Sequence, residues 1–83
     1  MFWRRVSIEG PVELIDGKLT LVIPLGEGGD RLAKYAEGIG TIEGDNLVVV
    51  IQPWLAEKLD VQAGTLVIVD NHTRKFRITR SDK

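Results

Sequence analysis

Few side chains in this sequence could carry catalytic chemistry, and they are scattered. A nucleophilic site needs Ser or Cys beside a His and an acid. Cysteine is absent, and the only histidine, His72, lies between the turn-forming residues Asn71 and Thr73. The serines Ser7 and Ser81 lie near the two ends of the chain. We therefore predict that the protein is not an enzyme and that His72 is a solvated turn residue.

Acidic residues could instead bind a metal, which requires clustered His, Asp or Glu side chains. Asp16, Asp45 and Asp70 each stand in a polar turn sequence. An aspartate in such a turn commonly accepts a hydrogen bond from the nearby backbone. We predict no metal site and no cofactor.

The segment Gly26-Glu-Gly-Gly-Asp30 precedes a predicted helix, as a phosphate-binding loop would. No Lys-Ser or Lys-Thr pair follows the glycines, and the carboxylates of Glu27 and Asp30 would repel a phosphate. A tight turn in which Asp30 caps the helix is the favoured interpretation. Ligand binding by this loop stays the alternative.

Basic side chains gather toward both ends of a chain whose net charge is −1. The candidate interaction residues are Arg4, Arg5, Arg74, Lys75, Arg77 and Arg80. Side chains alternate along a strand, so inward-facing Phe76 and Ile78 would leave Lys75 and Arg77 outside. If the first and last strands are neighbours, these residues form one patch for nucleic acid or an acidic protein partner. The alternative is that they protect edge strands from aggregation.

The chain has 83 residues, of which 43% are hydrophobic, and we predict a single domain over residues 1–83. Its longest apolar run, Leu47–Ile51, is far shorter than the roughly 20 residues of a membrane span. The lack of cysteine favours a cytoplasmic location. A domain this small buries only about 60% of its unfolded surface, so a partner chain would add stability.

Three turn sequences predict three β-hairpins, and hence six strands. Asp16-Gly17 lies between apolar runs and suits a type I′ turn, because both residues tolerate positive φ. The polar segments at residues 44–46 and 70–73 predict the other two hairpins.

Two short helices are predicted from apolar spacing and end signals. Residues 30–37 carry apolar side chains at helical spacing and are followed by Gly38. Residues 53–59 begin with Pro53 and place Leu55 and Leu59 on one face. Neither helix is long enough to be stable without packing on the strands.

The elements follow one another as two similar units, each with an apolar strand, a short helix and a Gly-led strand. One unit covers residues 17–42 and the other residues 45–66. We therefore predict a mainly β fold: a small six-stranded closed barrel with two short helices and a pseudo-twofold strand–helix–strand repeat. The run Leu47–Ile51 does not alternate, which indicates that both faces of this strand lose water.

Residues 44–80 contain an apolar strand, a short helix with two leucines, a Gly-led strand and a short basic strand. The residues in matching places are Ile51, Leu55, Leu59, Val61, Gly64, Val67, Val69, Phe76 and Ile78. This order resembles the AbrB/MazE-like swapped-hairpin family. With Ile23-Pro24 of the first half as a fused second copy, the chain is also similar to cradle-loop barrels of the RIFT and double-psi type.

The resemblance implies intertwined copies and, for most members, DNA binding as transcription regulators or antitoxins. The family's in-strand basic residue is replaced here, because Val48, Val49 and Val50 fill those places. We therefore favour a non-catalytic interaction or assembly module that forms a homodimer, with no membrane partner. The alternative is an AbrB/MazE-like DNA-binding regulator or antitoxin, and an enzyme or small-ligand protein ranks third.

Overall fold

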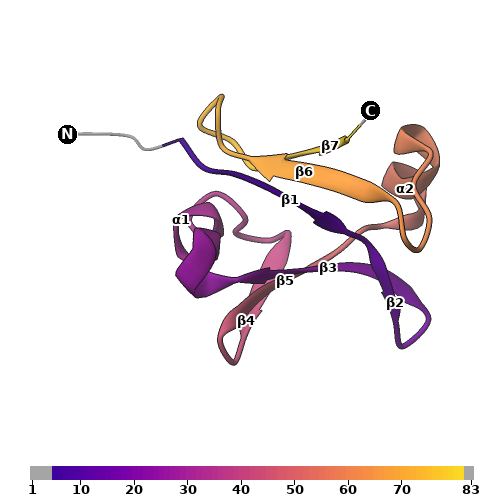
Figure 1. The fold of residues 1–83 in the computed structure, drawn as a ribbon, viewed down its shortest axis with the longest axis horizontal. Coiled ribbons are helices and arrows are strands. Elements are labelled where there is room, and N and C mark those ends of the chain that lie inside the picture. Colours follow the sequence, from indigo (N-terminus) through magenta and orange to yellow (C-terminus); the bar gives the residue numbers. More distant parts are fainter. Residues whose placement is uncertain (1–4, 82–83) are drawn as a thin grey trace.

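The chain folds into two antiparallel β-sheets, with a short helix at each end of the molecule (Figure 1). This computed structural model describes residues 5–81. The strands are β1 (Ser7–Pro11), β2 (Glu13–Ile15), β3 (Lys18–Pro24), β4 (Gly40–Glu43), β5 (Asn46–Val50), β6 (Leu66–Asp70) and β7 (Arg77–Arg80). The helices are the 3-10 helix η1 (Leu25–Glu27), α1 (Gly29–Ala33) and α2 (Pro53–Leu59). The candidate residue Arg4 lies outside the described residues.

The predicted closed barrel is wrong, because the two sheets stay open. One sheet has the order β1-β6-β7 and the other β2-β3-β5-β4, and no strand ladder within residues 5–81 joins them. The chain passes between the sheets at the buried Val12, so that β1 pairs with β6 while β2 pairs with β3. The Val12 amide donates to the Thr65 carbonyl at 2.9 Å, and the Gly64 amide donates to the Val12 carbonyl at 2.8 Å. This division of the first strand gives seven strands instead of six.

The predicted pseudo-twofold repeat is also wrong, although the two units do follow each other along the chain. Their first strands, β3 and β5, pair with each other antiparallel. Their second strands occupy different places: β4 pairs with β5, whereas β6 lies between β1 and β7 in the other sheet. The helices differ as well, since α1 has five residues and α2 seven.

Local signals placed the turns correctly. Asp16 and Gly17 both have positive φ, 52° and 76°, which confirms the type I′ hairpin between β2 and β3. Residues 44–45 connect β4 to β5, with Glu43 opposite Asn46. The third hairpin is present, but its loop is longer than the predicted turn at residues 70–73: residues 71–76 join β6 to β7, so Lys75 and Phe76 precede the strand.

The second helix is confirmed with its predicted bounds, and Pro53 stands at its start. The first is shorter than predicted, and Asp30 does not cap it. The cap position is Gly28, with φ 111°, and the Asp30 carboxylate accepts only from the neighbouring Arg31 amide. Neither these helices nor any other in residues 5–81 is long and apolar enough to span a bilayer.

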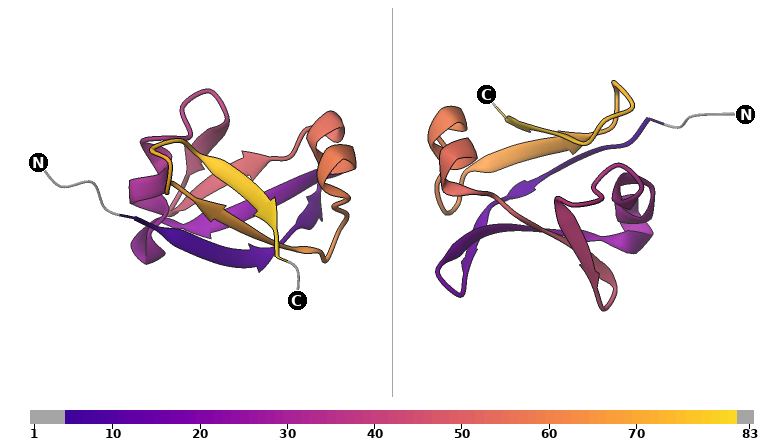
Figure 2. Two further views of the ribbon diagram at one scale, coloured as in Figure 1. Left: turned by 90° about the horizontal axis from the view of Figure 1, so that it is seen from above. Right: turned by 180° about the vertical axis from the view of Figure 1, so that it is seen from behind.

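A core of aliphatic side chains fills the space between the sheets. The buried apolar residues are Val6, Val12, Leu21, Ile23, Leu32, Ala36, Leu47, Val49, Ile51, Ala56, Val61, Val67 and Val69. Along β5 burial alternates, with Leu47 and Val49 buried and Val48 and Val50 half-buried. The outer face of β5 therefore remains partly exposed to solvent in a single copy of the chain. The two helices lie at opposite ends of the sheets, as the view from above shows (Figure 2).

Candidate functional site

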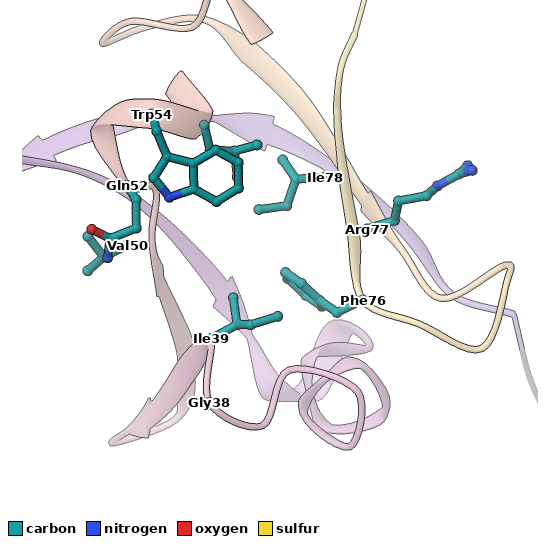
Figure 3. Close-up of a pocket in the computed structure, with 9 residues that line it drawn as sticks. Gly38, Ile39, Val50, Gln52, Trp54, Phe76, Arg77 and Ile78 are labelled. Atoms are coloured by element: carbon teal, nitrogen blue, oxygen red, sulfur yellow. The ribbon is translucent and has the colours of Figure 1, made fainter. Parts of the chain in front are cut away.

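One concave surface of the described chain is an apolar groove at the open side between the sheets. It has a volume of about 340 Å³ and is lined by residues of three separate segments: Gly38, Ile39, Val50, Gln52, Trp54, Leu55, Phe76, Arg77 and Ile78. Phe76 and Ile78 reach into it from the last hairpin, opposite Ile39 and Trp54 (Figure 3). The Arg77 side chain points the other way, out of the groove (Figure 3). We call this surface the β7 groove.

One wall of the β7 groove is a strand edge with outward-facing backbone groups. The order β1-β6-β7 leaves one side of β7 without a neighbouring strand in the described chain. The Ser81 amide donates to the Leu66 carbonyl of β6 at 3.0 Å. Because antiparallel pairing alternates residue by residue, the amide and carbonyl of Ile78 point to the opposite side, the edge of the sheet. The same residue thus offers a side chain to the groove and hydrogen-bonding groups to a further strand.

The predicted basic residues are not gathered into one patch. Strand β6 separates β1 from β7, so the first and last strands are not neighbours. Arg74 and Lys75 lie in the exposed loop before β7, close in sequence to Arg77. Arg5 instead lines a different cavity, together with the loop at residues 25–28 and Asp30.

Two of these basic side chains are paired with carboxylates. The Arg77 guanidinium lies 3.4 Å from the carboxylate of the buried Asp70 and is half-exposed. The Arg80 guanidinium lies 3.0 Å from the exposed carboxylate of Asp60 and also donates to the Asp60 carbonyl. Arg80 sits opposite Val67, at the far end of β7 from the loop. These partners lower the positive potential that the two arginines would offer to nucleic acid.

Exposed apolar side chains lie on the two edge strands of the four-stranded sheet, β2 and β4. Leu14 of β2 is 62% exposed, and Ile42 of β4 is 60% exposed. Ile15, at the end of β2, is also exposed. Both hairpins project away from the three-stranded sheet (Figure 1). We call Leu14, Ile15 and Ile42 the hairpin residues, and β3 and β5 separate the first two from the third.

The glycine-rich loop has a packing explanation. A Cβ on Gly28 would stand 2.9 Å from the Val6 side chain, in a backbone conformation with φ 111°. A Cβ on Gly29 would stand 2.8 Å from the Pro24 carbonyl oxygen. These glycines let α1 approach β1 and β3 closely, and the geometry gives no separate support to a phosphate site.

The remaining chemistry-bearing residues have local roles. The Asp70 carboxylate accepts from the His72 amide at 3.1 Å, closing the turn that the sequence indicated. His72 is half-buried in this turn and so is less solvated than predicted. Throughout the described part of the chain, no three His, Asp or Glu side chains come together in a group that could hold a metal ion.

The β7 groove was missed in the sequence because its residues come from three separate segments. The sequence indicated that Phe76 and Ile78 face inward, but it gave no signal that brings them together with Ile39 and Trp54. Comparison with known proteins gives no further guidance: no family model, curated protein or solved structure matches the chain. The resemblance to the AbrB/MazE-like family therefore rests on the sequence pattern alone.

Proposed function

We propose that this protein is a non-catalytic interaction module that assembles as a homodimer. The observation that carries the proposal is the set of large apolar side chains left exposed on the edge strands of the four-stranded sheet, Leu14, Ile15 and Ile42. Apolar side chains that one small domain does not cover are candidates for contact with a second copy. Burying them between two copies would also compensate for the small core of an 83-residue chain.

The half-buried valines of the outer face provide a second apolar surface on the same sheet. Val22 and Val48 are paired across β3 and β5, and Thr41 of β4 continues their row. All three side chains are uncharged and face the side opposite the core. Contact between two such faces would bury β-branched side chains without desolvating a charge, which favours stable packing.

Sedimentation equilibrium of the wild-type chain and of two matched variants tests the homodimer. We expect Ile42→Asp to weaken self-association by about tenfold or more, because it places a charge in the interface. Leu66→Asp is the control, since Leu66 is exposed on the other sheet. A wild-type species at the monomer mass of 9.2 kDa at micromolar concentration would overturn the proposal.

The alternative proposal is a DNA-binding regulator or antitoxin. It is favoured by the three neighbouring basic residues Arg74, Lys75 and Arg77 at one end of the three-stranded sheet. Against it stand the ion pair of Arg77 with Asp70 and the separation of Arg5 from this group. We therefore rank the interaction module first, and its cytoplasmic location stays a prediction.

A further inference from the structure

We propose that the β7 groove binds an extended peptide segment in which apolar and acidic residues alternate, as an added antiparallel strand on the edge of β7. The inference rests on the proposed function, that the chain is an interaction module, and it names the chemistry of a partner. It concerns a different surface from the hairpin residues of the four-stranded sheet. The two proposals can therefore fail separately.

The backbone of β7 provides the first argument. The amide and carbonyl of Ile78 point away from β6, toward the open side of the sheet. An extended segment laid along this edge would exchange hydrogen bonds with Ile78, as in other cases of strand addition. The strand has four residues, so a segment of about five residues would cover it.

The groove determines which side chains of the added strand must be apolar. Residues opposite each other in a sheet face the same side, so a residue opposite Ile78 would point into the groove. There it would meet Trp54, which is 66% exposed, and Ile39, which is 50% exposed. Both flank the groove opposite Phe76 and Ile78 (Figure 3). An apolar side chain at this position would cover all four residues.

Charge determines the other positions of the added strand. A residue opposite Arg77 would face outward, on the side to which the half-exposed Arg77 guanidinium points (Figure 3). Residues 74–80 contain four basic side chains and no acidic one. An acidic residue opposite Arg77 would be attracted to its guanidinium, whereas a basic residue would be repelled by it. The same repulsion disfavours β7 of a second copy as the occupant of the groove.

The test uses the full chain and a fluorescein-labelled peptide, Ser-Val-Glu-Val-Glu-Val-Ser, followed by fluorescence anisotropy. We expect saturable binding that is at least about tenfold weaker when both glutamates are replaced by lysine. N-methylation of the central valine removes an amide that would face β7, and should weaken binding by about tenfold. N-methylation of one glutamate is the matched control, because that amide points away from β7.

Protein variants locate the site. Trp54→Ala should weaken binding by about tenfold, whereas Leu66→Ala, on the outer face of the three-stranded sheet, should leave it within about twofold. Arg77→Gln should reduce the preference for glutamate over glutamine in the peptide to about one. Thermal melts of each variant show whether the fold is retained, which matters because Arg77 is paired with Asp70. Trp54 is mostly exposed, so its replacement is expected to leave the fold intact.

The outcomes separate the two proposals. Equal binding of the glutamate and lysine peptides, or equal effects of the two N-methyl groups, would overturn the added strand. So would a lack of peptide binding by a chain that sediments as a homodimer, which would leave the proposed function standing. Loss of both peptide binding and self-association would overturn both. Dissociation of the homodimer by the peptide would make a second copy the occupant and would also contradict this inference.

Discussion

Gly29 determines how closely α1 approaches the end of β3. A Cβ at this position would stand 2.8 Å from the Pro24 carbonyl oxygen and 3.0 Å from that of Ile23. Real Cβ atoms essentially never come within 3.0 Å of backbone, so the helix must shift if a side chain is added. Gly29 is itself buried, and the shift would disturb the packing of the buried Leu32. The glycine is therefore required by packing rather than by a ligand.

We expect Gly29→Ala to lower the free energy of unfolding by about 1–3 kcal/mol, the usual range for overpacking. Gly26→Ala is the control, because nothing lies within 4 Å of a Cβ built on Gly26. It should change the stability by less than about 0.5 kcal/mol. Urea denaturation of the two variants measures the difference. Equal stability of both variants would show that the loop can move away from β3 without cost.

At the scale of single residues, the sequence predicted the structure best where a residue type favours one backbone conformation. The Asp16-Gly17 turn followed from the tolerance of these residues for positive φ, which both adopt. The same reasoning failed at Asp30, because Gly28 takes the cap position and its conformation comes from packing against β1. A capping pattern in the sequence does not show which atoms of other strands pack against the backbone at the start of the helix.

At the scale of elements, the two helices are held by different amounts of burial. Leu32 of α1 is fully buried, and Ala36 follows it in the core. In α2 only Ala56 is buried, while Leu55 and Leu59 are half-buried against the core. The sequence predicted that these two leucines anchor the second helix. The structure shows that they cover the core from its edge.

We expect Leu32→Ala to lower the free energy of unfolding by about 2–5 kcal/mol, the range for a buried leucine. Leu55→Ala should cost about half as much, because part of this side chain remains in contact with water in the folded state. Chemical denaturation of both variants gives the comparison. A larger loss for Leu55→Ala than for Leu32→Ala would contradict the assigned burial of the two helices.

Elements defined by local signals were predictable, and their pairing was not. Pro53 and the spacing of Leu55 and Leu59 gave α2 its correct bounds. The division of the first strand at Val12 comes directly after Gly10-Pro11, a local break signal that the prediction of six strands did not use. What divides it is the long-range pairing of Val12 with Gly64 and Thr65. The two sheets stay open because the first strand is divided in this way. The barrel prediction did not include this division.

At the scale of the whole molecule, the distribution of charge limits binding to DNA. Arg77 and Arg80 already have carboxylate partners, and Arg5 lines a cavity that also includes Glu27 and Asp30. These acidic groups would lie close to any duplex that approached the basic residues. Among the described residues, Arg5 is therefore separate from the group of Arg74, Lys75 and Arg77.

We expect any binding to duplex DNA to be no tighter than the non-specific range of about 10⁻⁴–10⁻⁶ M at physiological salt. Binding should weaken with salt, at a log–log slope of about −0.9 for each phosphate contacted. Anisotropy titrations with random-sequence and selected duplexes measure both quantities. Nanomolar affinity for one sequence, abolished by Arg77→Ala, would reverse the order of the two proposed functions.

The pairing of β1 with β6 has a consequence for the order of folding. Ser7 lies opposite Asp70, so β1 can pair with β6 only after β6 has been synthesised. The hairpins β2–β3 and β4–β5 need only nearby residues and can form earlier, because short loops close at lower entropic cost. Until β6 is available, β1 is an extended segment without a partner strand, open to contacts with chaperones or other nascent chains. In pulse-labelling hydrogen exchange during refolding, the amides of β4 and β5 should become protected before those of β1; the reverse order would show that the ends meet first.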